Sequence, residues 1–329
     1  MALATAGLLA AGCGGGGEGD GDALQNVPET GGLREKLRGA DAPAEADFPA
    51  ADGRSLQQVA DSMTGGPQAA LAGRQFTVGR NRLAFGVVDP QGMFVYGKSA
   101  VYVAPTPDAK ATGPYPAPAD LLVTDPPFRS RQAAAETDLF AAVYAADVPL
   151  PKAGKWSALT VTQADGGLVA APAQLSVDTK AADEVPAVGE PAPRVQTDTL
   201  ASAKGDEQAI DTRLPPAPAL HETSFSEVVG SKPVALLFAT PQLCQSRVCG
   251  PVTDIALQLE AEYGDRMEFI HQEVYVDNDP GKGLRAPLKR FNLASEPWLF
   301  VVGADGEVTA RLEGSFGLKA FERAIGTAL

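Results

Sequence analysis

The alternation of apolar and polar positions divides the chain into regions of different character. Between residues 73 and 180, short β-rich runs are separated by Gly and Pro turn residues, and there is almost no helical period. The clearest runs are NRLAFGVVD, SAVYVAP, LFAAVYAADVPLP, GKWSALTVTQ and AQLSVD. Short strands with this punctuation predict an all-β sandwich domain over residues 73–180, with Trp156 filling part of its core.

Residues 221–329 instead alternate helical and strand patterns. In chain order they read helix SFSEVV, strand PVALLFA, helix PVTDIALQLEAEYG, strand MEFIHQEVYV, helix APLKRF, strand PWLFVV, turn ADG, strand VTARLEG and helix LKAFERAIGTAL. Such alternation is typical of an α/β domain. The sequence therefore predicts a second domain, of mixed type, over residues 221–329.

Two further regions have no sustained period. Residues 14–72 are mostly Gly, Ala, Asp, Glu and Pro, and only SLQQVADSM suggests a short helix. Residues 181–220 are rich in Pro, Ala and acidic residues. Compositions of this kind predict a disordered tether over residues 14–72 and an interdomain linker over residues 181–220.

The first residues, MALATAGLLAAGC, resemble a bacterial lipoprotein signal. An apolar run precedes Gly12 and Cys13, and the resemblance implies a signal peptide over residues 1–13 and a lipid anchor on the Cys13 thiol. No Lys or Arg precedes the run, and Ala10 stands where such signals more often have Leu. The alternative is a short disordered N-terminus, whereas the lipoprotein interpretation predicts an extracytoplasmic protein held at the cell membrane.

Charge excludes some classes of partner. The chain has 41 acidic and 27 basic residues and a formal net charge of −14. A nucleic-acid or anionic-membrane surface requires a basic patch, so we expect no nucleic-acid partner.

The C-terminal pattern resembles the thioredoxin fold. Cys249, followed by Gly250-Pro251, stands where a strand gives way to a helix, and Pro297 precedes a later strand that ends in an ADG turn. The resemblance implies that Pro297 is cis and lies against the active-site sulfurs. Glu296 stands before it, where the family often has Thr, Val or Ile. The sandwich in turn resembles the small immunoglobulin-like domains of bacterial exported proteins.

Setting Cys13 aside leaves only Cys244 and Cys249. In thioredoxins the resolving cysteine lies three residues after the first, but that position after Cys249 is Val252. Cys244 is the one substitute, and four intervening residues can curl until the Cα atoms are about 4.4–6.8 Å apart, as a disulfide requires. An exported cysteine pair therefore predicts a reversible or structural disulfide.

The roles of the two cysteines follow from the predicted helix. A cysteine at a helix N-terminus has its thiolate stabilised, and Arg247 adds positive charge, so we expect Cys249 to be the more acidic nucleophile. Counting forward from the strand VALLFA would choose Cys244 instead. That strand also lacks the buried carboxylate that many thioredoxins carry.

These features predict a thiol-disulfide oxidoreductase that acts on exported protein thiols or disulfides through Cys249, Cys244 and Pro297, without a cofactor. One alternative is a Sco-type copper chaperone, which would need a histidine beside the cysteines. The chain has only His221 and His271, and we expect both to be ordinary surface or packed residues, so no metal ligand is assigned. The other alternative is an interaction module whose cysteines form a structural disulfide.

Overall fold

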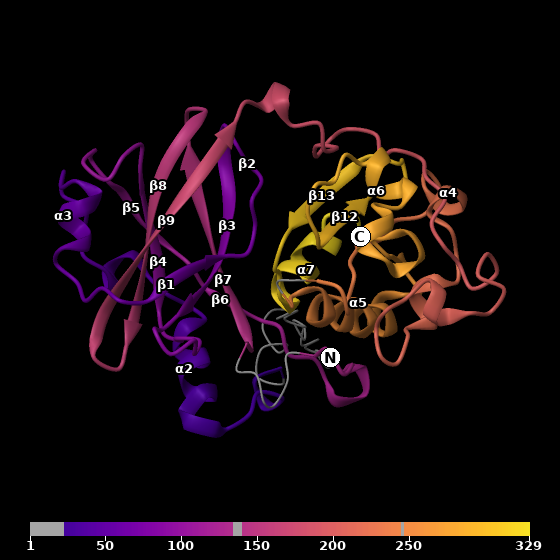
Figure 1. The fold of residues 1–329 in the computed structure, drawn as a ribbon, viewed down its shortest axis with the longest axis horizontal. Coiled ribbons are helices and arrows are strands. Elements are labelled where there is room, and N and C mark those ends of the chain that lie inside the picture. The colour runs from indigo at the N-terminus through magenta and orange to yellow at the C-terminus, as the bar shows by residue number, and fades with distance from the viewer. Residues whose placement is uncertain (1–22, 134–139, 245–246) are drawn as a thin grey trace, which may run out of the picture.

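The computed structural model describes residues 23–133, 140–244 and 247–329. The predicted signal peptide, including Cys13, lies outside them. Figure 1 shows two lobes side by side, the first formed by the earlier half of the chain and the second by the later half. Within the described residues, no helix is long and apolar enough to cross a membrane.

The first lobe is a two-sheet sandwich. One sheet has the order β1-β3-β7-β6 and the other β2-β9-β8-β4-β5, and only the β2–β9 pair is parallel. The strands are β1 (Gln68–Leu71), β2 (Phe76–Thr77), β3 (Gly79–Val88), β4 (Ser99–Ala104), β5 (Thr112–Pro116), β6 (Ala119–Leu121), β7 (Ala142–Leu150), β8 (Gly154–Ala164) and β9 (Gly167–Asp178). The five strands predicted from the sequence are confirmed, as is the buried Trp156. The other four were missed because they are short.

The predicted disordered tether is wrong for the part of it that the structure describes. This part contains α2 (Leu33–Ala40), α3 (Leu56–Ala60) and β1. Every residue of β4 is buried, so the outer face of its sheet needs a cover, and the segment around α3 supplies it. Val59 and Phe48 pack there with Tyr102. A strand with apolar residues on both of its faces, such as β4, must be covered on both sides, so its sequence indicates that another segment packs on the outer face.

The second lobe contains one sheet of order β11-β10-β12-β13, with β10 parallel to β11 and antiparallel to β12. Its elements are α4 (Phe225–Val228), β10 (Val234–Phe238), α5 (Cys249–Tyr263), β11 (Glu268–Gln272), α6 (Ala286–Arg290), β12 (Trp298–Val302), β13 (Val308–Glu313) and α7 (Leu318–Ile325). All the predicted elements of this domain are confirmed. A parallel β10-α5-β11 unit followed by an antiparallel hairpin and α7 is a thioredoxin-like arrangement.

Residues 181–220 connect the two lobes but are not a free linker, since they pack along the second lobe. Val185 and Val195 join the core on one face of its sheet. Polar side chains hold the rest through three pairs: Asp183 with Arg311, Asp198 with Arg285, and Thr212 with Glu273. A segment poor in apolar residues is thus ordered mainly by hydrogen bonds and ion pairs, which composition alone does not reveal.

Two buried carboxylates join the lobes. Asp120, on β6, accepts hydrogen bonds from the backbone N–H groups of Gly317, Lys319 and Ala320, and so caps α7 of the other lobe. Asp254, on α5, forms an ion pair with Arg213 at 2.8 Å. It also accepts hydrogen bonds from the backbone N–H and the hydroxyl of Ser130. One apolar core runs through both lobes between these contacts.

We predict that Asp254→Ala lowers the free energy of unfolding by about 3–5 kcal/mol, because it leaves the Arg213 charge buried without its partner. The two side chains are only 3% and 1% exposed. Urea denaturation of the double variant Arg213→Met/Asp254→Leu should recover most of that loss. Asp147→Ala is the control, because its partner Arg80 is exposed, and it should cost roughly 0–1 kcal/mol. Equal losses for Asp254→Ala and Asp147→Ala would contradict the structural role of this pair.

Candidate functional site

The cysteine loop connects the end of β10 to the start of α5. Cys249 is the first residue of α5, as predicted. Backbone hydrogen bonds from Cys244 to Thr240 and from Arg247 to Cys244 fold the loop back on itself. Arg247 has a φ of 59°, which reverses the chain immediately before the helix. As a result Cys244 lies within hydrogen-bond reach of Cys249, and both are present as thiols.

The two thiols differ in burial. Cys249 is 0% exposed, whereas Cys244 is 8% exposed. Burial raises the pKa of the Cys249 thiol well above its ordinary value, and the hydrogen bond and charge of Cys244 raise it further. A backbone hydrogen bond from Thr240 acts in the opposite direction. Desolvation of Cys249 thus opposes the thiolate stabilisation that was expected from its place at the helix N-terminus.

Glu296, which precedes Pro297 in the proline loop, lies near Cys244. The Glu296–Pro297 peptide bond is cis, as the resemblance implied, and the Pro297 carbonyl accepts a hydrogen bond from the backbone N–H of Gly314. Burial and the nearby Cys244 raise the pKa of the Glu296 carboxyl, and Arg74 lowers it. Glu296 and Arg74 of the first lobe also line one cavity.

A cavity of about 480 Å³ opens at this point. Its lining comes from both lobes: residues 71–74 of the first, and Tyr275, residues 294–296 and residues 313–314 of the second. Its walls are largely polar, with Arg74, Glu296 and Glu313 among them. The proline loop is thus open to a ligand on the side that faces Glu296.

The opposite side of the helix N-terminus is covered by the first lobe. A Cβ on Gly250 would lie 2.5 Å from the backbone oxygen of Gln132, so only glycine fits. Ser130 and Arg213 hold Asp254 one turn further along α5. The first lobe therefore fixes the position of the helix that carries Cys249.

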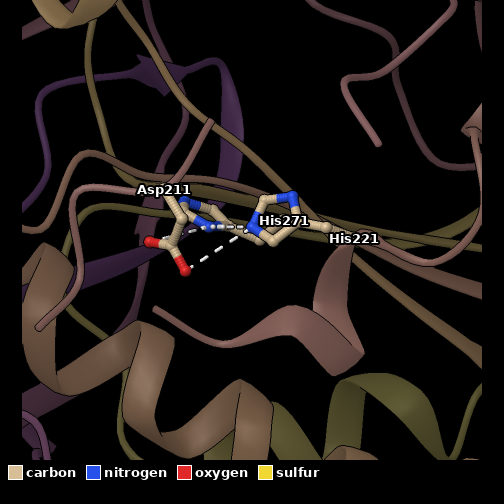
Figure 2. Close-up of side chains that lie close together, drawn as sticks. All are labelled: Asp211, His221 and His271. Carbon is tan, nitrogen blue, oxygen red and sulfur yellow. Dashed lines mark hydrogen bonds and ion pairs between the residues drawn. The ribbon is translucent and has the colours of Figure 1, made fainter. Parts of the chain in front are cut away.

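A second buried cluster lies next to Ala239, which follows the end of β10. There Asp211, His221 and His271 point toward one another (Figure 2). His271 Nδ1 is 3.3 Å from His221 Nε2 and 3.7 Å from an Asp211 oxygen, and His221 Nε2 is 3.6 Å from the other oxygen. All three residues are at most 1% exposed. The histidines are packed, as one form of the expectation had it, but the sequence did not reveal that they meet each other and Asp211.

The charges in this cluster are uneven. Burial raises the pKa of Asp211, but its hydrogen bond to His221 and the charges of both histidines lower it more, to about 2. Burial lowers the pKa of His271, and this exceeds the opposing effect of Asp211. The cluster therefore contains a carboxylate beside at least one neutral imidazole.

Sequence reasoning missed this cluster because its members come from distant segments. Asp211 lies in the supposed linker, His221 ends the 3-10 helix η6 (Pro218–His221), and His271 lies on β11. No local spacing connects them. The one available signal was that the only two histidines of the chain lie in the same predicted domain, His221 at its start and His271 within a strand.

The histidines do not complete a copper site with the cysteines. His271 Nε2 lies 3.0 Å from the Ala239 carbonyl oxygen, and its Nδ1 faces His221 and Asp211. Both nitrogens of His271 are thus directed at groups other than the sulfurs. A Sco-type ligand set of two thiolates and one imidazole is not assembled in this arrangement.

No protein-family model and no curated protein matches this chain. Solved structures with partial similarity include a thiol:disulfide interchange protein of the thioredoxin family from Chlorobium tepidum TLS, 17% identical, which covers 42% of this chain and 94% of that chain with a TM-score of 0.29. A structure from Chlorobium tepidum assigned to the thiol:disulfide interchange protein DsbE is also 17% identical, covering 44% of this chain and 98% of that chain with a TM-score of 0.29. A thioredoxin-like superfamily protein is 14% identical over 32% of this chain and 85% of that chain, with a TM-score of 0.23. The thioredoxin-like description of the second lobe rests on its own strand order and helix positions.

We predict that Cys249 is alkylated more slowly than Cys244, and that its rate rises only at higher pH. The comparison uses Cys244→Ser and Cys249→Ser in a Cys13→Ser background, so that one thiol reacts in each. Because the acid form of Cys249 is favoured by burial, it should keep its proton above the ordinary cysteine pKa of about 8.5. Iodoacetamide rates measured from pH 6 to pH 10 test this, with the urea-unfolded variants as the reference. A half-maximal pH for Cys249 at or below that of the unfolded chain would refute it.

Proposed function

We propose that this protein performs thiol-disulfide exchange through the Cys244/Cys249 pair, a thioredoxin-like site with a Cys-x4-Cys spacing. The observation that carries the proposal is the position of Cys244 within hydrogen-bond reach of Cys249, at the N-terminus of α5 and beside Glu296 and Pro297. A structural disulfide would not need the cavity that opens at the proline loop.

Burial assigns the order of the two steps. Cys244 is the more exposed thiol, so its thiolate attacks one sulfur of a client disulfide. A Cys244–client disulfide forms, and the other client sulfur leaves as a thiolate that takes up a proton. The Cys249 thiolate then attacks the Cys244 sulfur, which releases the second client thiolate and leaves a Cys244–Cys249 disulfide. The client gains two electrons, and the reverse sequence oxidises a client dithiol.

The raised pKa of Cys249 is consistent with this order. Two of its causes, the hydrogen bond and the charge of Cys244, disappear once Cys244 is bonded to a client. Desolvation, the largest cause, remains, and so does the hydrogen bond from Thr240, which favours the thiolate. Cys249 is therefore held as a thiol before the first step and is easier to ionise for the second.

The client would occupy the cavity beside Glu296 and Tyr275. A partly polar opening between the lobes suits an exposed, cysteine-bearing segment of a client. The clients are exported proteins, because the proposed location of this protein is extracytoplasmic. Arg74 and Glu296 offer charges of opposite sign to the segment that enters. No cofactor takes part in the exchange.

The first lobe is proposed to be an immunoglobulin-like domain that supports the redox domain. Its strand order supports this: β1-β3-β7-β6 corresponds to the ABED sheet of immunoglobulin domains, and β9-β8-β4 to GFC. The sequence gives it no cysteine for the inter-sheet disulfide of antibody domains. Its contacts with Gly250 and Asp254 support a role in positioning α5.

The proposed location is the extracytoplasmic face of the cell membrane, with Cys13 as the lipid attachment site. The support is the LAAGC sequence at residues 9–13. An oxidising compartment also suits a site that cycles through a disulfide.

We predict that Cys249→Ser accumulates mixed disulfides with clients, because the first step proceeds through Cys244 and the second cannot. Cys244→Ser should accumulate far fewer, although it keeps the same number of thiols. Non-reducing gels of acid-quenched cells, with Cys13 intact in both variants, measure the adducts. If trapping occurs through Cys249 instead, the order is reversed, and if neither variant traps a client, the pair is structural.

A second prediction concerns the anchor. Cys13→Ala should move the protein from the membrane fraction to the soluble fraction, or leave it unprocessed, because no thiol remains to be acylated. Cell fractionation and detergent phase partitioning measure this, and Cys244→Ala is the matched control that should stay at the membrane. Full solubility of the unaltered chain would exclude the anchor.

A further inference from the structure

The cluster of Asp211, His221 and His271 takes no part in the proposed thiol exchange. His271 Nδ1 lies 3.3 Å from His221 Nε2, and each of these nitrogens lies 3.6–3.7 Å from a different oxygen of Asp211. One ligand atom from each residue lies within 4.8 Å of the other two. Around a tetrahedral zinc ion, ligand atoms at about 2.0–2.2 Å from the metal lie about 3.3–3.6 Å from one another. The cluster is therefore close to the spacing of three metal ligands.

The side chains are also oriented as ligands. A carbonyl oxygen only accepts hydrogen bonds, so the contact with Ala239 requires that His271 Nε2 carries the proton. Its Nδ1 then presents a lone pair to the cluster. Metal-bound histidines commonly donate the other ring N–H to a backbone carbonyl in this manner. The Asp211 oxygens are oriented in turn by the backbone N–H groups of Arg213 and Ala217.

Hydrogen bonding within the protein does not fully satisfy this cluster. Asp211 offers only acceptor oxygens, and Nδ1 of His271 offers only a lone pair. His221 Nε2, if it carries a proton, is then the single donor for both of these acceptors within the cluster. His221 Nδ1 is buried and has no hydrogen-bond partner among the described residues. Three electron-rich atoms thus converge on one buried point, which a cation would stabilise.

We propose that Asp211, His221 and His271 form a binding site for a divalent metal ion of the zinc type. Two imidazoles and one carboxylate suit Zn²⁺, whereas Mg²⁺ and Ca²⁺ prefer oxygen ligands throughout. Cu(I) prefers thiolates and would select the cysteines. Three protein ligands leave a fourth position for water.

The proposed ion has a structural task. It would tie His221 at the end of η6, and Asp211 in the segment before it, to His271 on β11. The carbonyl of Ala239 accepts a hydrogen bond from His271 in the cluster. The next residue, Thr240, forms a backbone hydrogen bond with Cys249. The ion would therefore stabilise the end of β10, where the cysteine loop begins, without contacting the sulfurs.

The test uses the full chain with Cys13→Ser, Cys244→Ser and Cys249→Ser, so that no thiol competes for the metal. Zn²⁺ is offered to the folded protein and also during refolding, because a fully buried site fills slowly. We expect one Zn²⁺ per chain by elemental analysis after gel filtration, and a higher unfolding temperature with Zn²⁺ than with EDTA. Co²⁺ in its place should give the visible absorption of a four-coordinate ion.

Asp211→Asn and His271→Gln, each in that background, should weaken Zn²⁺ binding by about 100-fold or more, because even outer partners of a metal ligand typically contribute 10–100-fold. Asp120→Asn is the matched control, because Asp120 is a buried carboxylate on β6 outside the cluster and its supporting segment, and it should retain one Zn²⁺ per chain. Circular dichroism of the metal-free variants separates loss of a ligand from loss of the fold. Absence of zinc from the refolded parent, or binding that survives both Asp211→Asn and His271→Gln, would overturn the proposal. Neither result bears on client trapping by the cysteines.

Discussion

The buried ion pair between Asp254 and Arg213 is the constraint on which the rest of the arrangement depends. Asp254 lies on the helix that begins with Cys249, Arg213 lies in the segment that connects the lobes, and Ser130 reaches the same carboxylate from the sandwich lobe. An ion pair this deeply buried must be completely hydrogen-bonded, since each unmet group would cost more than the pair contributes. Three segments far apart in sequence are therefore held in one relative position.

Fixing this helix determines the chemistry of the cysteines. The N-terminus of an isolated helix would favour a thiolate at Cys249, but the neighbouring lobe covers that end of the helix and removes the sulfur from water. Desolvation opposes that effect at Cys249, and in the proposed exchange the more exposed Cys244 is therefore the entering thiol. In that proposal, the packing that stabilises the two-lobe structure also changes the roles expected from the helix alone.

Polar contacts add to apolar burial in the segment from residue 181 to residue 220. Its acidic residues and threonines meet partners on the sheet and helices of the second lobe, and Thr212 also accepts a hydrogen bond from Gln242 in the cysteine loop. Asp211 brings this segment to both histidines. A stretch with the composition of a linker thus contributes Asp211 to the cluster with His221 and His271. It also supports the cysteine loop through Thr212.

The sequence by itself determined the elements that rest on local periodicity. The strand runs at 81–89 and 99–105, the alternation across 221–329 and the junction at Cys249 are set by spacing along the chain, so they needed no knowledge of distant partners. Pro297 was likewise placed by its position before a strand. Tertiary structure alone decided whether residues 14–72 and 181–220 are ordered, because their order comes from partners elsewhere in the chain. It also decided the burial of Cys249 and the meeting of Asp211, His221 and His271, since burial and long-range contact depend on how the two lobes pack and leave no trace in local spacing.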